Sequence, residues 1–269
     1  MKKIFAVILA ALMLFSLAAC GGNEKPVEEA NKTVVVGYTI YEPMNYLDEN
    51  GELVGFDTEL AKAVFGNLGY EVIFQEIEWS SKYTDLDSNT IDCVWNGFTA
   101  NTADSDGILR SEKVDFSYNY MLNKQVVVTT KDLVGTVVDF DSLSCKVGCV
   151  EKGSAGATYR ESFTGSVEKA VTSQLEALKQ LALGTVDFVV LDEQLAKAYV
   201  GKGDYADLAI ADAVSSPSEY YAIGFKKGSD LTALVNKALE ELAADGTIAK
   251  IAEKYGVATT AITDFSDQK

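Results

Sequence analysis

Two stretches of this chain, ninety-five residues apart, share one pattern: an apolar run that ends in polar side chains. The first reads NTIDCVWNG over residues 89–97, and the second reads GTVDFVVLD over residues 184–192. The apolar run of the second stretch is nearly continuous, which is typical of a strand that is buried on both faces. Asp192 stands at its carboxyl end, where open α/β sheets bind their ligands. The repeat predicts two similar units, each ending in polar groups.

Strands and helices alternate in the predictions around both stretches. The Asn-Gly pair at 50–51 indicates a hairpin, and Asp57 is expected to be the N-cap of the helix that follows. Strands are expected at 33–38, 70–77, 91–95, 125–130, 145–150, 186–191 and 220–225. Helices are expected to about 67, at 80–87, from 153–156, from Ser173 to 183, at 192–200, at 229–244 and to near 256. This βαβ rhythm predicts an α/β fold with a mostly parallel sheet and helices on both faces.

The first nineteen residues have the features of an export signal. Lys2 and Lys3 precede an apolar run over 4–17 that is too short to span a bilayer. The ending Leu-Ala-Ala-Cys at 17–20 resembles a bacterial lipobox, which implies cleavage before Cys20 and a lipid on its sulfur. We therefore expect a signal peptide over 1–19, then the lipidated cysteine and a tether over 20–32. The alternative is an ordinary signal peptide with an incidental cysteine.

Composition excludes several classes of function. Without Lys2 and Lys3 the chain has 21 basic and 40 acidic residues, so nucleic acid is not an expected partner and a lipid must supply the anchoring to the cell membrane. The chain contains no histidine, which removes Ser-His and Cys-His nucleophile pairs, and neither a metal nor another cofactor is expected. Cys93 is interpreted as a small buried hydrophobe, and Cys145 and Cys149 are expected to be too far apart for a disulfide.

Five further motifs occur in a fixed order. They are Tyr-Glu-Pro-Met at 41–44, the run 50–57, Ile-Asp at 91–92 with Asn-Gly-Phe-Thr at 96–99, the run 114–120, and 184–187 with Asp192. Together with the lipobox they resemble the family 3 extracellular solute-binding proteins, which are polar amino-acid receptors of ABC importers. The resemblance covers about residues 34–255.

This resemblance implies a type II periplasmic-binding-protein-like fold, in which two α/β lobes are joined by two crossover hinge strands. The crossings are expected near 123–129 and 218–225. Lobe 1 would be discontinuous, built from 33–123 and 224–269, and lobe 2 with the hinge strands would be built from 124–223.

A free amino acid presents an ammonium, a carboxylate and one variable side chain. Asp192 is well placed to accept from the ammonium, and the Gly-rich helix start at 153–156 offers N–H donors to the carboxylate. The resemblance implies that these roles belong to the residues matching Asp192, Ser154, Thr99 and Asn96 with the Gly97 backbone, and that Tyr41 and Trp79 sandwich the ligand.

Structural alternatives exist for several of these residues. Asp192 can be the N-cap of its helix, and Ser154 can be a cap as well as a ligand contact. Trp79 can be core packing. Asp92 and Asp187 are interpreted as structural, capping or turning the start of their strands.

The arginine that grips the ligand carboxylate in the family stands about five residues after the position of Thr99. Counted forward along the loop, that position is Asp104. Counted backward from 115–117, it is Arg110. An insertion reconciles the two counts, and we expect Arg110 to bind the ligand; the alternative is a surface arginine near Glu112.

The resemblance also bears on specificity. Tyr38 stands where receptors for dibasic amino acids tend to carry an acidic residue, so a neutral or polar ligand is expected, although Glu42 can meet a basic one. The expected function is a monomeric, lipid-anchored receptor that closes around an amino acid and delivers it to ABC permease subunits. Two alternatives remain: a sensing module acting through a partner protein, and an enzyme on the same fold.

Overall fold

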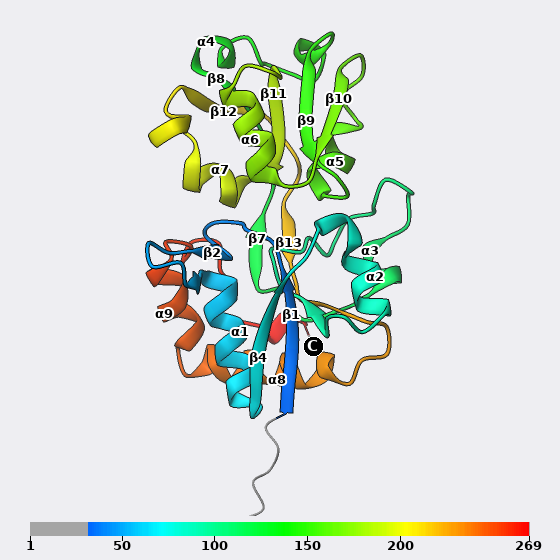
Figure 1. Cartoon of the computed structure of the whole chain (residues 1–269), viewed down its shortest axis with the longest axis vertical. Coiled ribbons are helices and arrows are strands. Elements are labelled where there is room, and N and C mark those ends of the chain that lie inside the picture. The colour runs from blue at the N-terminus through cyan, green and yellow to red at the C-terminus, as the bar shows by residue number, and fades with distance from the viewer. Residues whose placement is uncertain (1–31, 269) are drawn as a thin grey trace, which may run out of the picture. The chain divides into compact units, whose positions relative to one another are not determined.

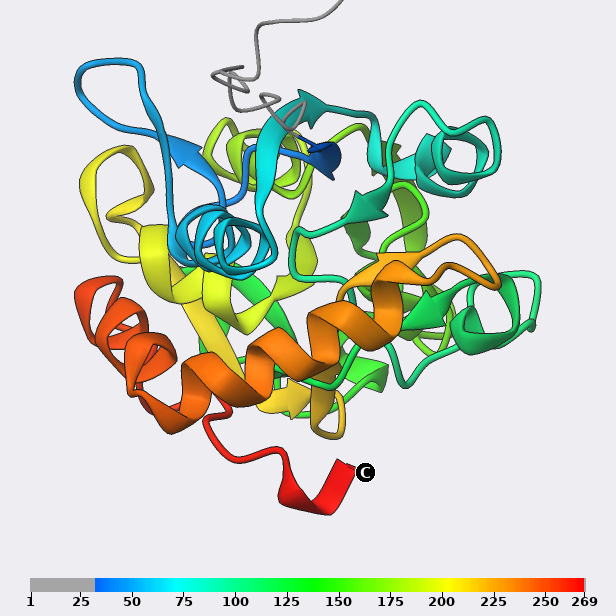
Figure 2. The same ribbon diagram turned by 90° about the horizontal axis from the view of Figure 1, so that it is seen from below.

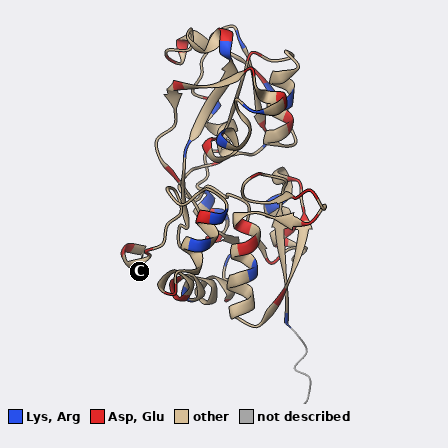
Figure 3. Ribbon diagram, turned by 90° about the vertical axis from the view of Figure 1, so that its left-hand side faces the viewer, with Lys and Arg blue, Asp and Glu red and all other residues tan. Residues whose placement is uncertain are grey.

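The computed structural model describes residues 32–268 and is shown in Figure 1. The predicted signal peptide, Cys20 and the tether up to residue 31 lie outside the described residues. Within 32–268, no helix combines the length and the apolar character that crossing a bilayer requires. Asp and Glu are spread over the helices and loops around both sheets, with Lys and Arg interspersed (Figure 3).

The first sheet has five strands in the order β4-β1-β5-β14-β6. Their bounds are Tyr70–Glu76 for β4, Lys32–Tyr38 for β1, Cys93–Val94 for β5, Gly224–Phe225 for β14 and Asp115–Phe116 for β6. β1 runs parallel to β4 and β5, whereas β14 runs antiparallel to β5 and β6. A late segment of the chain is thus inserted into a sheet that the early segments begin.

The second sheet has the order β10-β9-β11-β8-β12. The bounds are Val167–Val171 for β10, Val147–Glu151 for β9, Phe188–Asp192 for β11, Gln125–Thr130 for β8 and Leu208–Ser215 for β12. Every residue of β11 is buried, as its continuous apolar run predicts. The edge strands β10 and β12 are absent from the predictions.

The prediction of mostly parallel sheets is wrong, because both sheets are mixed. In the second sheet β10, β9 and β11 are parallel, but β8 is antiparallel to β11 and to β12. β9, β10 and β11 are consecutive strands linked by helices, the connections that parallel pairing requires, whereas β8 is consecutive with neither of its neighbours, β11 and β12.

Two short strands connect the sheets. β7 (Met121–Asn123) leads through Lys124 into β8, and β13 (Glu219–Tyr221) follows β12. The two pair antiparallel with each other and lie between the two sheets in Figure 1. The fold therefore has two crossing strands, as the resemblance implies. β13 lies within the crossing expected near 218–225, whereas β7 overlaps the crossing expected near 123–129 only at Asn123.

The remaining elements cover the sheets. α1 (Phe56–Asn67), α8 (Leu231–Ala244) and α9 (Thr247–Lys254) pack on one another, with α8 running across the view of Figure 2. The others are the hairpin of β2 (Tyr46–Leu47) and β3 (Leu53–Val54), and η1 (Trp79–Ser81), α2 (Lys82–Asp87), α3 (Arg110–Lys113), α4 (Lys131–Val134), η2 (Asp141–Leu143), α5 (Ala155–Arg160), α6 (Gln174–Ala182), α7 (Glu193–Tyr199), η3 (Gly203–Tyr205) and η4 (Ser266–Gln268).

The start of α1 differs from the prediction. Its N-cap is Gly55, not Asp57, and no side chain caps it. Gly55 has φ 124°, and a Cβ there would lie 2.2 Å from the carbonyl oxygen of Met44, so the tight entry requires glycine. Asp57 is therefore inside the first turn, and its carboxylate is free to turn toward the sheet.

The two aspartates inside the repeated stretches are structural, as predicted. The N–H of Val35 donates to Oδ2 of Asp92 at 2.7 Å, and the N–H of Asp92 donates back to the Val35 carbonyl at 2.8 Å. Asp187 makes the same pair of bonds with Val147, at 2.7 and 2.9 Å. Each aspartate thereby fixes its strand against the neighbouring parallel strand.

The three cysteines of the described residues are free. Cys93 is buried, as predicted, Cys149 is also buried, and Cys145 is exposed.

Candidate functional site

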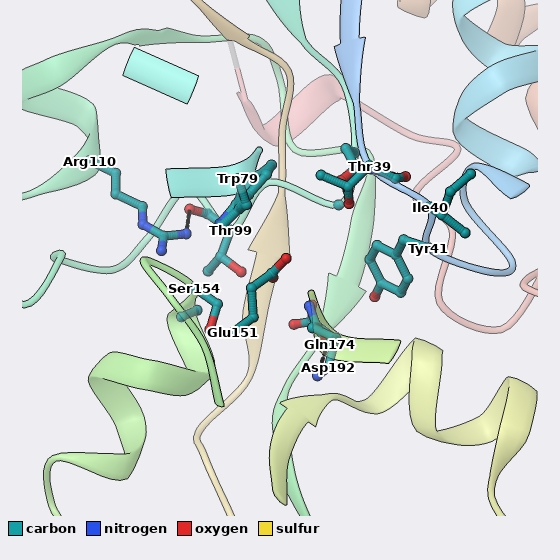
Figure 4. Close-up of a pocket in the computed structure, with 13 residues that line it drawn as sticks. Thr39, Ile40, Tyr41, Trp79, Thr99, Arg110, Glu151, Ser154, Gln174 and Asp192 are labelled. Atoms are coloured by element: carbon teal, nitrogen blue, oxygen red, sulfur yellow. Dashed lines mark hydrogen bonds between the residues drawn. The ribbon is translucent and has the colours of Figure 1, made fainter. Parts of the chain in front are cut away.

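A cavity lies between the two sheets, with walls from both (Figure 4). Residues 39–41 follow β1, residues 96–99 follow β5, and Glu151 and Asp192 end β9 and β11. All eight residues predicted to bind a ligand line this cavity: Tyr41, Trp79, Asn96, Gly97, Thr99, Arg110, Ser154 and Asp192. The lining also includes five residues that the predictions omit: Thr39, Ile40, Glu151, Ala155 and Gln174.

Asp192 is a buried carboxylate held by amide donors. Oδ1 accepts from Nδ2 of Asn123 at 2.7 Å and from Nε2 of Gln125 at 2.6 Å, and Oδ2 accepts from Gln174. The residue occupies the N-cap position of α7, but its side chain makes no capping bond, so that alternative explains only its place in the chain. Burial raises the pKa of Asp192, and the amide bonds oppose this shift.

A second carboxylate shares these donors from the hinge. Nε2 of Gln125 also donates to Oε2 of Glu219 at 2.8 Å, and the hydroxyl of Thr99 lies 3.3 Å from the same oxygen. Burial and then the charge of Asp192 raise the pKa of Glu219 to about 7. Glu219 does not line the cavity, so it acts on Asp192 from behind the wall.

Arg110 lines the cavity and is 1% exposed. Its Nε donates to Oδ1 of Asp104 at 2.8 Å, Nη1 donates to the Thr99 carbonyl at 3.1 Å, and Nη2 donates to the Gly153 carbonyl at 3.3 Å. The alternative of a surface arginine is therefore wrong. Arg110 connects the first-sheet side of the cavity to the turn that follows β9.

Asp104 and Arg110 are the two positions at which the family's arginine could be placed by counting forward or backward, and they form an ion pair with each other. The loop folds back on itself, since the N–H of Arg110 donates to the Thr102 carbonyl and that of Asp104 donates to the Ile108 carbonyl, both at 3.0 Å. Burial alone would raise the pKa of Asp104, but Arg110 and Lys113 outweigh it and lower this pKa to about 2. The loop at 101–109 therefore supplies the counter-charge of the cavity's arginine.

The turn at 153–154 meets a second buried cation. Nζ of Lys82 donates to the Gly153 carbonyl at 3.1 Å and lies 4.8 Å from the centre of the Trp79 ring. Burial first, and then the charge of Arg110, lower the pKa of Lys82 to about 7. Ser154 is the N-cap of α5, where its Oγ accepts from the N–H of Ala157 at 3.0 Å, and it also lines the cavity.

Tyr41 and Trp79, the two aromatic residues predicted to contact a ligand, both pack in buried clusters and both line the cavity. Trp79 packs edge-on against Phe98 at 5.1 Å within a buried cluster, so the core-packing alternative is correct and its ring also lines the cavity. The hydroxyl of Tyr41 lies 2.6 Å from that of Tyr221, and Tyr41 belongs to the main buried cluster. Both rings are thus held rigidly in the wall.

The turn after β5, at Asn96 and Gly97, carries no charge, and its polar groups already have hydrogen-bond partners in the protein. Nδ2 of Asn96 donates to the Thr39 carbonyl at 2.9 Å, and its Oδ1 accepts from the Thr39 hydroxyl at 2.7 Å. The N–H of Gly97 donates to Oδ2 of Asp57 at 2.8 Å. Gly97 has φ 57°, and a Cβ there would lie 2.6 Å from the ring of Tyr41. Asn96 and Gly97 therefore shape the wall, and the Gly97 N–H is already used.

Glu151 and Gln174 are the polar residues that sequence reasoning missed in the second-sheet wall. Glu151 is 4% exposed, and Figure 4 shows its side chain in the middle of the cavity. Burial first, and then the charge of Asp192, raise its pKa to about 8. The available signals were positional, because Glu151 ends a buried strand two residues before Gly153, and Gln174 directly follows the cap residue Ser173.

Two α/β sheets joined by two crossing strands, with a polar cavity between them, define a two-lobe binding protein of the type II periplasmic class. Residues 34–258 match the model of the bacterial extracellular solute-binding proteins, family 3. The chain belongs to this family.

Curated relatives and solved structures agree with this assignment. The chain is 30% identical to the L-cystine-binding protein TcyA of Bacillus subtilis (strain 168), across 95% of this chain and 97% of the relative. It is 27% identical to the arginine-binding extracellular protein ArtP of the same organism, across 95% and 98%. An ancestral arginine-binding protein bound to arginine superimposes with a TM-score of 0.74 at 35% identity, across 83% of this chain and 97% of that one.

Proposed function

We propose that this protein is an extracytoplasmic receptor that binds one free amino acid and delivers it to an ABC importer. The observation that carries the proposal is the presence of opposite charges on the two walls of one cavity. Arg110 and Asp192 are both buried there, and they lie on opposite sides of Glu151 in Figure 4. A zwitterion presents the complementary pair of charges. The relatives named for arginine and cystine binding support the same ligand class.

In the proposed complex the ligand carboxylate meets Arg110 and the turn at Ser154, and the ammonium meets Asp192. Tyr41 and Trp79 contact the carbon chain. Charge-assisted hydrogen bonds of this kind contribute about 1.5–3 kcal/mol each, so a few of them support binding in the micromolar range.

Binding is proposed to proceed by hinge closure between lobe 1, residues 33–123 with 224–269, and lobe 2, residues 124–223. β7 and β13 are the hinge. The bonds from Arg110 and Lys82 to the Gly153 carbonyl join the two proposed lobes. A ligand that touches both walls favours the closed state because only that state satisfies both of its charges. A lipid on Cys20 is proposed to hold the monomeric receptor at the membrane.

Thermal unfolding of residues 23–269, stripped of bound ligand, tests this function. The described residues, 32–268, belong to one compact unit, so residues 23–269 are expected to fold by themselves. One or a few amino acids at about 100 times the dissociation constant should stabilise it by roughly 2.7 kcal/mol, and Asp192→Ala should abolish the shift. No shift with any amino acid or cystine would contradict the proposal.

We propose binding without catalysis. The ligand should therefore be recovered unchanged after long incubation with stoichiometric protein. Conversion of the ligand, dependent on Glu151 or Lys82, would instead support an enzyme on this fold.

The prediction of a neutral ligand side chain depended on Tyr38. That ring packs edge-on against Phe74 at 6.1 Å, and Tyr38 does not line the cavity. Glu42 is also outside the lining; burial and then the charge of Glu42 raise the pKa of Tyr199. The charge of the ligand side chain therefore depends on other residues of the wall.

A further inference from the structure

We propose that Glu151 binds a second cationic group of the ligand, so that the amino acid carries an ammonium or guanidinium besides its α-ammonium. This inference rests on the proposed function and names the class of amino acid that the same cavity takes.

The position of Glu151 is the first step. It is the last residue of β9, is 4% exposed and lines the cavity. Its side chain reaches the middle of the cavity, between Tyr41 and Asp192 on one side and Trp79 and Thr99 on the other (Figure 4). No ion pair among residues 32–268 includes it.

The other charges of the wall already have roles. Arg110 is paired with Asp104 and faces the ligand carboxylate in the proposed complex. Asp192 is held by three amide side chains and faces the α-ammonium. Lys82 donates to two backbone carbonyls, those of Trp79 and Gly153. A zwitterion with an uncharged side chain matches Arg110 and Asp192 and offers no cation to the carboxylate of Glu151.

An uncompensated carboxylate is costly inside a protein, so it takes up a proton or finds a cation. The charged groups around Glu151 are Asp192 on β11, Lys82 on α2 and Arg110 on α3, and the hydroxyl of Tyr41 faces it from the segment after β1. Burial first, and then Asp192, raise the pKa of Glu151, whereas Lys82, the side-chain amide of Gln174 and Arg110 lower it; the resulting pKa is about 8. Near pH 7 the ligand-free carboxyl is therefore mostly protonated.

A cationic side chain would change this state. It favours the ionised carboxylate, so Glu151 releases its proton when the ligand binds. Affinity for such a ligand should rise as the pH increases from 6 to 8, because less work is then needed to remove that proton. Affinity for an uncharged side chain should lack this dependence on Glu151.

Titration calorimetry of residues 23–269 tests the inference with arginine, lysine and ornithine against glutamine and norleucine. At pH 7, in two buffers of different ionisation enthalpy, the basic amino acids should bind at least about thirtyfold more tightly and release protons. Cystine is a further arm, because its second ammonium can meet the same carboxylate. Tight binding of cystine that depends on Glu151 would support a second cationic group from that source.

Glu151→Gln should lower the ratio of affinities for the favoured ligand over glutamine at least about thirtyfold, and should remove the proton release that distinguishes the favoured ligand from glutamine. Glu161→Gln makes the same chemical change at an exposed position of the second-sheet region and should alter none of these quantities. Glu151→Asp keeps the charge and should retain the preference for basic ligands, which gives a readout if the glutamine variant folds poorly.

Two outcomes overturn the inference. In the first, glutamine or norleucine binds as tightly as the basic ligands. In the second, Glu151→Gln leaves the ratio of affinities unchanged. If a neutral amino acid binds in a manner that depends on Asp192, the receptor function stands and only the inference fails. If no amino acid binds, both fail.

Discussion

The two repeated stretches, 89–97 and 184–192, begin alike. Asn89 and Gly184, at their first positions, both have left-handed backbones, with φ of 57° and 69°. Three residues later Asp92 and Asp187 each exchange two hydrogen bonds with the neighbouring parallel strand. The shared half of each stretch is therefore a device for starting a strand in register.

The stretches end differently. Asn96 and Gly97 finish the first one, and their polar groups bond within the first-sheet region. Asp192 finishes the second one, and its carboxylate lies in the cavity wall among amide donors. The same motif therefore starts both strands, but the strand ends contribute differently to one cavity: Asn96 and Gly97 shape its wall, and Asp192 places a carboxylate in it. Four predictions test this division, from the largest expected effect to the smallest.

Asp192→Ala should weaken ligand binding at least about a hundredfold, because it removes the acceptor of the ammonium in a desolvated cavity. Titration calorimetry with the best ligand measures this loss. Asp187→Ala, five residues earlier on the same stretch, should change the dissociation constant less than about twofold. A comparable loss in both variants would show that the start and the end of the stretch do not have separate roles.

Gly97→Ala should lower the free energy of unfolding by about 2–4 kcal/mol, since the new Cβ meets the Tyr41 ring at 2.6 Å in a left-handed conformation. Gly184→Ala should cost only about 1 kcal/mol, because φ is 69° there but no atom lies within 4 Å of the added Cβ. Urea unfolding of both variants measures the difference. Equal costs would mean that the packing at Gly97 adds nothing to the backbone effect.

A buried carboxyl lies near the end of each of the two stretches, and its pKa in the folded protein is raised to about 7. Burial raises that of Asp57, which accepts from Gly97, and burial with Asp192 raises that of Glu219. A carboxyl whose pKa is higher in the folded protein than in the unfolded chain contributes fully to stability below the unfolded pKa, which is near 4. This contribution is lost as the pH rises from 4 through 7. Each group should therefore cost up to about 1.4 kcal/mol per pH unit across that window.

Thermal unfolding of the ligand-free protein between pH 4 and 8 tests this, with Asp57→Asn and Glu219→Gln each expected to reduce the fall in midpoint. A midpoint that falls equally in the wild type and in both variants would assign the pH dependence to other groups.

The smallest effect concerns the shared half. Asp92→Ala and Asp187→Ala should each lower the free energy of unfolding by about 1 kcal/mol, because each loses one partly exposed hydrogen bond. The two costs should agree within about 0.5 kcal/mol if the motif does the same work in both sheets. Urea unfolding under one set of conditions gives both values, and a clear inequality would break the parallel.

Much of this could be predicted from the sequence where local pattern and tertiary environment agree. The continuous apolar run of β11 and the Asn-Gly hairpin are examples, as are the cap at Ser154 and the eight predicted residues that line the cavity. The resemblance to a family was needed for Tyr41, Trp79 and Arg110, since no local pattern distinguishes a cavity-lining aromatic ring or arginine from a structural one.

Other features depend on partners that are distant in sequence. β10 includes Glu168 and Lys169 at an edge of the second sheet, where one side of the strand is solvated and charged residues are tolerated, so no apolar pattern marks it. Asp57 was interpreted as a helix cap because the groups that donate to its carboxylate are distant in the sequence. These groups are the N–H of Gly97 and the hydroxyl of Tyr120. Glu151 looked like an ordinary strand end because only the fold places it beside Asp192.

The place of β14 has a consequence for the order in which the molecule can fold. Residues 224–225 lie between β5 and β6 in the first sheet, although they follow all the strands of the second sheet in the chain. A chain that is made from its amino end therefore cannot complete its first sheet until residue 225 has been added. Such long-range pairing slows folding, because the entropy of closing a long loop is lost before the strands pair.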